Sequence, residues 1–192
     1  MNKGKLILML ALVFLFFSSN AQIKRLDTLA QLGKSGYRVY TSNKSNEKNA
    51  VNIKLVGFES EARDLDFVVE GKIKSIAVED FNNDGFPDLL LFVYSGTDFS
   101  KVNVFGIASE ENKRCVPIFF PDIRDDAKLR VGYNGHDEFT IIEGNLFRKF
   151  PVYNPDNLNS PPTDVKRNIQ YRVVKSDKGA YKFQVVRTYE SK

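Results

Sequence analysis

Cysteine, tryptophan and histidine are almost absent from this chain of 192 residues, which has one cysteine, no tryptophan and one histidine. A single cysteine excludes an intrachain disulfide. Cys115, beside Val116 and Pro117, is most simply a small buried apolar residue, with a reactive thiol as the alternative. A lone histidine gives no support to a zinc site and little to acid–base catalysis. Stability must therefore come from an apolar core, for which this length suffices.

A strong charge of one sign is also missing. The chain has 28 basic and 24 acidic residues, a formal net charge of +4. Lysine and arginine are spread along the sequence and do not gather in a stripe. This balance predicts no nucleic-acid partner.

A long apolar run occurs only once, at the N-terminus. Lys3 and Lys5 precede an apolar run over residues 6–17, and small residues follow it. The run is shorter than the roughly 20 residues of a membrane-spanning helix, so we predict a cleaved secretory signal peptide at residues 1–21. An uncleaved membrane anchor is the alternative. After cleavage, residues 22–192 would form one periplasmic or secreted domain without a membrane span.

The rest of the chain alternates apolar and polar residues, which is typical of β-strands. Two pairs of such segments predict hairpins, 139–142 with 146–150 and 169–174 with 181–186. Weak helical spacing occurs only at residues 23–32. The fold class is therefore predicted as all-β, an antiparallel two-sheet β-sandwich or flattened barrel of roughly eight to ten strands. Other alternating segments are 37–40, 51–56, 73–78 and 102–105.

Two segments interrupt this pattern. Residues 42–49 are polar throughout, which predicts a mobile loop. Residues 153–166 contain three prolines, too many for a strand.

An acidic loop precedes the apolar run 89–92. A calcium loop delivers oxygens from positions 1, 3, 5, 7 and 9, with glycine at position 6. Gly85 falls at position 6, but position 12 is Leu91 where an EF-hand has glutamate. The loop predicts a structural Ca²⁺ site between strands, with a metal-free turn as the alternative. The five oxygen positions are Asp80, Asn82, Asp84, the carbonyl of Phe86, and Asp88.

A denser motif begins at residue 132 and continues to residue 171. Its first block is Gly132, Tyr133, Gly135, His136, Asp137, Glu138 and Phe139. Its second block is Leu146, Arg148, Lys149, Phe150, Pro151 and Tyr153. Its third block is Pro162, Thr163, Arg167, Gln170 and Tyr171.

With these blocks and the acidic loop, the chain resembles the periplasmic inhibitors of I-type (invertebrate-type) lysozyme over about residues 73–186. The resemblance implies an exported two-sheet β protein without catalytic activity. It also implies that lysozyme is the partner and that a loop after the central strand inserts into the lysozyme active-site cleft. In this chain that partner-binding loop is Ser95, Gly96, Thr97, Asp98, Phe99, Ser100 and Lys101.

The loop departs from the family pattern because it has one glycine, and Phe99 or Tyr94 must stand in for the tyrosine of the family. A lysozyme cleft carries two carboxylates, one of them kept protonated. Thr97, Ser100 and Lys101 could donate hydrogen bonds to these groups, whereas the charge of Asp98 would oppose insertion unless it points outward. An ordinary hairpin connection without a partner is the alternative.

Other polar residues of the motif have structural interpretations. His136, between Gly135 and two acidic residues, favours a hydrogen-bonded cluster over catalysis. Arg148, Lys149 and Arg167 are predicted to be solvated strand residues, with a second contact patch as the alternative. An exported Ca²⁺-binding sandwich recruited to another periplasmic or cell-wall partner is the competing function. These motifs do not predict an oligomeric state.

Overall fold

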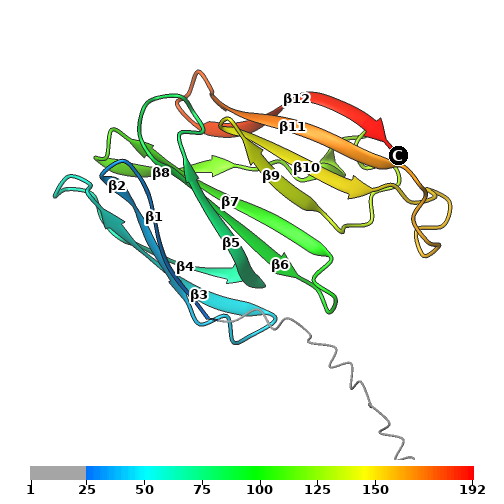
Figure 1. The fold of residues 1–192 in the computed structure, drawn as a ribbon, viewed down its shortest axis with the longest axis horizontal. Helices are drawn as coiled ribbons and strands as arrows, with labels where there is room; N and C mark the ends of the chain where they lie inside the picture. Colours follow the sequence, from blue (N-terminus) through cyan, green and yellow to red (C-terminus); the bar gives the residue numbers. More distant parts are fainter. Residues whose placement is uncertain (1–24) are drawn as a thin grey trace, which may run out of the picture.

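The computed structural model describes residues 25–192 and folds them into twelve β-strands and one short 3-10 helix (Figure 1). The first four strands form an antiparallel sheet in the order β1-β2-β3-β4. They are β1 (Leu26–Leu32), β2 (Ser35–Thr41), β3 (Lys48–Val56) and β4 (Leu65–Glu70).

The other eight strands form a second, curled sheet in the order β5-β6-β7-β8-β12-β11-β10-β9. Its neighbours are antiparallel except β8 and β12, which pair in parallel at Tyr181↔Ile118 and Lys182↔Phe119. The helix η1 (Ile123–Asp125) lies between β8 and β9. The strands are β5 (Lys72–Glu79), β6 (Asp88–Ser95), β7 (Lys101–Glu110), β8 (Arg114–Phe119), β9 (Glu138–Ile142), β10 (Asn145–Pro151), β11 (Lys166–Lys175) and β12 (Tyr181–Ser191).

Strand β6 has apolar side chains on both faces, because it lies between two cores. Successive side chains of a strand point to opposite faces. Leu89, Leu91 and Val93 pack into the core between the two sheets. Leu90 and Phe92 pack into the core inside the curl of the larger sheet. Each side chain of this size stabilises the fold by about 1.5–3 kcal/mol when buried, which explains an uninterrupted apolar run instead of alternation.

The predicted all-β, two-sheet class is confirmed, but the described residues contain twelve strands where roughly eight to ten were expected. The strands missed from the sequence are β1, β4 and β8. Strand β8 contains Pro117, which normally argues against a strand. Pro117 is tolerated because β12 pairs with β8 only beyond it, at Ile118 and Phe119.

The helical spacing expected at residues 23–32 is wrong for the described part, where Leu26–Leu32 is strand β1. Its residues alternate between half-buried and exposed over most of its length, and all seven pair with β2 from Leu26↔Thr41 to Leu32↔Ser35. Pairing with a neighbouring strand supplies the backbone hydrogen bonds that decide between two weak local preferences.

The polar segment 42–49 is not a loop throughout, because β3 begins at Lys48. The Asn43 amide donates to the carbonyl of Ile73 at 2.8 Å and accepts from its N–H at 3.1 Å. The Asn49 amide donates to the carbonyls of Ser45 and Gly71, both at 2.7 Å. These buried amides hold the segment against the start of β5. The polar side chains of the segment therefore have a structural role.

Both predicted hairpins are confirmed. In the first, β9 and β10 are joined by Glu143 and Gly144, whose φ angles of 50° and 70° are those of a type I′ turn. In the second, β11 and β12 pair through ten registered positions with a bulge at Gln170/Tyr171. Residues 153–165 contain no strand, as their prolines predict.

The remaining predictions concern the N-terminus and Cys115. The expected signal peptide, residues 1–21, lies outside the described residues. In the described part of the chain, no helix has the length and apolar character needed to cross a membrane. Cys115 is partly buried against the core between the sheets, and burial raises the pKa of its thiol to about 11. Such a thiol stays protonated near neutral pH and is unreactive.

Candidate functional site

The predicted partner-binding loop is the hairpin connection between β6 and β7. Ser95 pairs with Lys101, so the loop closes directly on the two strands. The Asp98 carboxylate accepts the Ser100 N–H at 3.1 Å, and the Phe99 N–H donates to the Gly96 carbonyl at 3.4 Å. The hydrogen bonds from Ser100 lower the pKa of Asp98, so its carboxylate is ionised and directed at its own loop.

Phe99 does not stand free at the tip of this loop. Its φ angle of 56° is uncommon for a bulky residue. The residue is half-buried, whereas Gly96, Thr97 and Asp98 are exposed. The Lys72 ammonium lies 5.9 Å from the centre of its ring. Phe99 therefore packs against strand β5, and the exposed tip consists of small and polar residues.

The motif that starts at Gly132 touches this loop directly. The His136 N–H donates to the Ser100 carbonyl at 2.7 Å. Gly135 has a φ angle of 83°, and a Cβ atom added there would lie 2.6 Å from the same carbonyl oxygen. Only glycine fits this approach. The structure thus brings two separately predicted groups, the loop and the motif, together at Ser100.

A buried ion pair lies beneath this contact. The Arg148 guanidinium donates to the Asp137 carboxylate through Nε at 2.6 Å and through a terminal nitrogen at 2.9 Å. The two side chains are only 3% and 0% exposed. The Tyr133 hydroxyl completes the cluster, donating to Asp137 at 2.6 Å and accepting from Arg148 at 2.8 Å. A bidentate pair with an added hydroxyl satisfies charges that would be costly to bury alone.

Aromatic rings surround the Arg148 guanidinium. Its central carbon lies 5.0 Å from the ring centre of Tyr133 and 5.6–5.8 Å from those of Phe120, Phe139 and Phe150. Burial disfavours the charged form, but the hydrogen bond and charge of Asp137 outweigh it and raise the pKa of Arg148. For the Tyr133 hydroxyl the charged form is the deprotonated one, so burial raises its pKa. Arg148 thus keeps its positive charge at the centre of the motif.

The remaining motif residues brace the same region. The Tyr153 N–H donates to the Gly132 carbonyl at 2.8 Å, and the ring of His136 stacks on Tyr153 at 6.3 Å. The exposed carboxylate of Glu138 lies 3.7 Å from the Lys149 ammonium, and Pro151 ends β10. The His136 side chain is exposed and its hydrogen bond to Ser100 comes from the backbone, so a structural role in place of catalysis stays a prediction.

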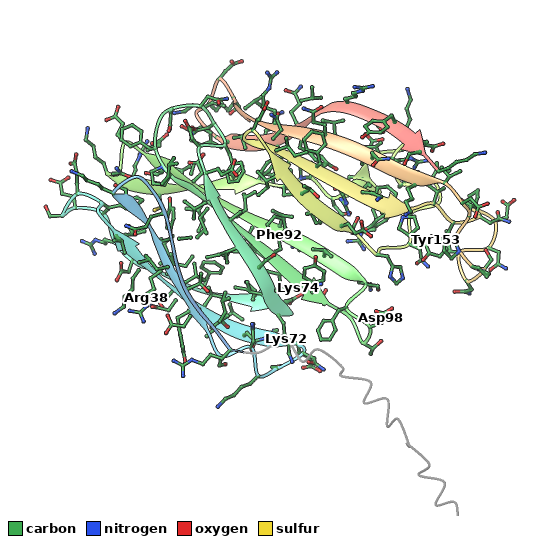
Figure 2. The ribbon with its side chains drawn as sticks, viewed as in Figure 1. Arg38, Lys72, Lys74, Phe92, Asp98 and Tyr153 are labelled. Carbon is green, nitrogen blue, oxygen red and sulfur yellow. The ribbon has the colours of Figure 1, made fainter. Side chains whose placement is uncertain are left out.

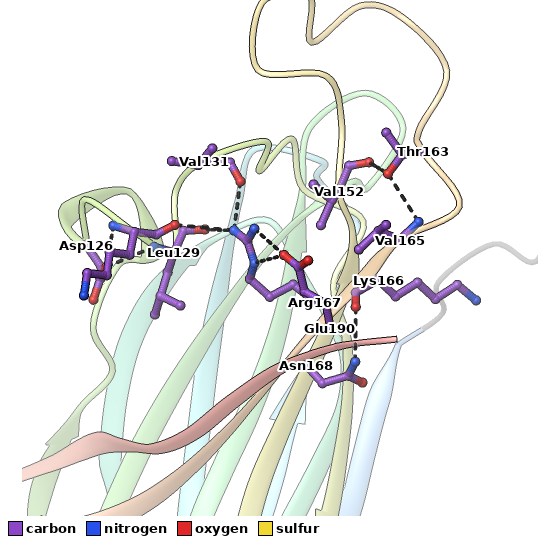
Figure 3. A network of polar contacts seen from close by, with 11 residues as sticks. Asp126, Leu129, Val131, Val152, Thr163, Val165, Lys166, Arg167, Asn168 and Glu190 are labelled. Atoms are coloured by element: carbon purple, nitrogen blue, oxygen red, sulfur yellow. Dashed lines mark hydrogen bonds and ion pairs between the residues drawn. The ribbon is translucent and has the colours of Figure 1, made fainter. Parts of the chain in front are cut away.

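The prediction that Arg148 and Arg167 are solvated is wrong, and the alternative of a second contact patch stays untested. Arg148 is buried as described. Arg167, whose side chain is 12% exposed, donates to the carbonyls of Leu129 at 2.9 Å and Val131 at 2.8 Å and pairs with Glu190 at 2.7 Å (Figure 3). Arg167, on β11, holds the long connection between β8 and β9 against this strand, and Glu190 on β12 fixes its guanidinium. Lys149, with a partly exposed side chain, is the solvated residue of the three.

A cavity of about 630 Å³ opens beside the loop. Its wall brings together the loop, the motif and the segment that follows β8, where Asp122 and Arg124 form an exposed ion pair. Sequence reasoning missed this segment because nothing in its composition distinguishes it from an ordinary connection. Lining residues include Ser95, Ser100, Lys101, Phe119, Phe120, Asp122, Arg124, Tyr133, Gly135 and Arg148.

The predicted calcium loop connects β5 to β6 at the opposite end of β6 from the partner-binding loop. The Asp80 carboxylate accepts the N–H groups of Asp84 at 2.9 Å and Gly85 at 2.8 Å. Asp84 accepts the Phe86 N–H at 3.0 Å and the Asn82 amide at 2.9 Å. Asp84 is exposed, and Asp80 and Asn82 are half-buried. Their oxygens retain further lone pairs, which is the chemistry that a hard cation requires of its ligands.

Asp88 differs from these residues because it is fully buried. Its carboxylate accepts the N–H groups of Phe81 at 2.9 Å, Asn82 at 3.2 Å and Ser109 at 3.0 Å. Burial raises its pKa to about 7, against the opposing effect of the Ser109 hydrogen bond. Asp88 therefore fastens the loop to β7, a role that the spacing alone did not reveal.

Within residues 25–192, no group of three or more histidine, cysteine or acidic side chains has the arrangement of a metal site. The Ca²⁺ assignment stays a prediction. No family model matches the sequence, and no curated protein matches it. The resemblance to inhibitors of I-type lysozyme therefore stays a prediction that rests on the motifs quoted above.

Proposed function

We propose that the protein is an exported, non-enzymatic binding protein that blocks a lysozyme by inserting residues 95–101 into its active-site cleft. The observation that carries the proposal is the contact between the loop and the motif, where the Ser100 carbonyl accepts the His136 N–H at 2.7 Å. A binding loop braced on a buried cluster loses little conformational entropy on association. The periplasm is the compartment we propose for this activity.

The chemistry of the loop suits this role. Thr97 and Lys101 are exposed donors at the edge of the loop, and a cleft with two carboxylates would accept hydrogen bonds from them. Asp98 was expected to oppose insertion. Its hydrogen bond to the Ser100 N–H turns the charge toward the loop backbone, which reduces repulsion of the cleft carboxylates.

The activity of I-type, C-type and G-type lysozymes on cell walls, measured with increasing amounts of residues 22–192, tests the proposal. We expect one class to be inhibited. Replacing both Phe99 and Ser100 by alanine should weaken inhibition at least tenfold. Gly135→Ala should do the same, because the new Cβ would meet the Ser100 carbonyl at 2.6 Å and displace the loop. Val186→Ala, at an exposed position of β12, is the control.

The alternative is that this exported β-sandwich binds another periplasmic or cell-wall partner and does not bind lysozyme. The half-buried position of Phe99 favours it, because Phe99, one of the two residues expected to replace the tyrosine of the family, packs on Lys72. The absence of inhibition of all three lysozyme classes at micromolar protein would reject the first proposal in favour of this one. In either case we propose Ca²⁺ as a structural ion, held by Asp80, Asn82 and Asp84.

A further inference from the structure

Lys72 is a charged residue in an unusual position. It is only 7% exposed, and its side chain forms no ion pair within residues 25–192. Its ammonium lies 5.9 Å from the ring centre of Phe99. The ammonium has no hydrogen bond to the described residues, and no fully buried side-chain polar atom there lacks one, so the ammonium keeps some contact with solvent. A buried lysine stem therefore presents a charge, without a counter-ion, beside the partner-binding loop.

Two more lysines that form no ion pair with the described residues lie at the same end of the sheet. The register of β5 and β6 shifts between Ile73 and Ser75, so Lys74 sits at a bulge, with its ammonium 4.8 Å from the ring centre of Tyr94. Lys101, at the start of β7, is exposed and pairs with Ser95. Figure 2 shows Lys72 and Lys74 at the same end of the sheet as Asp98.

Most acidic side chains near the three lysines already bond to other groups. Asp98 bonds to its own loop, Asp137 pairs with Arg148 and Glu138 pairs with Lys149. In the described chain, exposed Glu70 has no ion pair, and neither has exposed Glu47, whose carbonyl accepts the Gly71 N–H at 2.8 Å. Two such acids therefore lie near three such lysines.

An inward-pointing lysine can also protect an edge strand such as β5 from pairing with another chain. That role explains one lysine but does not require the others. It also leaves unexplained the uncommon backbone of Phe99, which places an aromatic ring against the Lys72 ammonium. A cation supported by a ring keeps its charge available to an external anion.

We propose that Lys72, Lys74 and Lys101, with the rings of Tyr94 and Phe99, form a cationic docking surface for carboxylate side chains of a protein partner. The inference rests on the proposed binding function of the adjacent loop and adds a second contact to it. Acidic groups on the rim of the partner cleft would meet the lysines while the loop enters the cleft. Charges at the rim of an interface mainly raise the association rate and its salt dependence.

The surface is tested with a blocked hexaglutamate peptide, and a blocked glycine–serine hexamer serves as the neutral probe. In 20 mM salt, hexaglutamate should shift the backbone amide resonances of residues 94–101, and the neutral peptide should not. Replacing Lys72 and Lys74 by glutamine should weaken binding about tenfold, whereas replacing both by arginine should preserve it. Lys54→Gln with Lys166→Gln removes the same charge from exposed positions on other strands.

The wild-type shifts should also fade in 300 mM salt, because the Debye length falls below about 6 Å. No shift in the loop, or equal weakening by the Lys54/Lys166 variant, would overturn the proposal. Binding of an anionic polysaccharide without hexaglutamate binding would overturn it as well.

Lysozyme inhibition separates this inference from the function on which it rests. Inhibition that is equal in the wild type and the Lys72/Lys74 glutamine variant at low salt would reject the docking surface and keep the proposed function. Hexaglutamate binding without inhibition of any lysozyme would reject lysozyme as the partner and keep the docking surface.

Discussion

The buried pair of Arg148 and Asp137 is the side-chain interaction on which the motif most depends. Both groups are almost fully excluded from water, and the Tyr133 hydroxyl takes part in the same cluster. Removing one partner leaves the other charge buried without compensation, which costs about 3–5 kcal/mol. We therefore expect Asp137→Asn to lower the free energy of unfolding by this amount, as measured by urea denaturation.

A double variant shows whether the loss comes from an unpaired charge. Replacing Arg148 by methionine and Asp137 by leucine removes both charges and keeps apolar bulk among the rings. This variant should be more stable than Asp137→Asn alone, with some loss remaining from the Tyr133 hydroxyl. A double variant less stable than either single one would contradict this account. Lys149→Met, a partly exposed position on the same strand, should change stability by less than about 1 kcal/mol.

The connection between β5 and β6 has two parts with different roles. Asp80, Asn82 and Asp84 lie on its accessible side, and Asp88 anchors it inside. If Ca²⁺ binds the native state alone with a Kd of about 0.1 mM, then 10 mM Ca²⁺ stabilises the fold by about 2.7 kcal/mol. We expect the midpoint of thermal unfolding to rise by about 5–10 °C between chelator and 10 mM Ca²⁺.

Asp84→Asn is the matched variant for this experiment. It keeps an oxygen that can accept the Phe86 N–H but loses the negative charge, so the Ca²⁺-dependent rise should largely disappear. A midpoint that is the same in chelator and in Ca²⁺ for the wild type would remove calcium from the proposal. The loop would then be a turn held by its own hydrogen bonds.

The two cores share strand β6 and should therefore unfold together. Leu91 packs between the sheets and Leu90 packs inside the curl, and neither is exposed. Each Leu→Ala change should destabilise the fold by about 2–5 kcal/mol. Both variants should lose structure in a single transition, with near-ultraviolet circular dichroism and tyrosine fluorescence changing at the same denaturant concentration. Separate transitions for the two probes would show that the sheets unfold independently.

Local chemistry explains which elements were predictable. Some features depend only on residues that are neighbours in the sequence, so they can be predicted from it. They are the alternation along β2, β3 and β5, the turn at Glu143 and Gly144, and the apolar run of β6. The same holds for the spacing of oxygens from Asp80 to Asp88. Strand β1 was not predictable because its local preference is weak and its pairing with β2 decides its conformation.

The sequence alone therefore establishes the β class, the two hairpins and the motifs that suggest a binding protein. The tertiary structure decides which of these meet, because sheet order and curl are set by long-range packing that no local pattern encodes. It places Gly135 and His136 against Ser100, buries Arg148 with Asp137, and gives Arg167 a structural role. Within residues 25–192 it also leaves the Lys72 ammonium without a counter-ion beside Phe99, since burial and pairing are properties of neighbours in space.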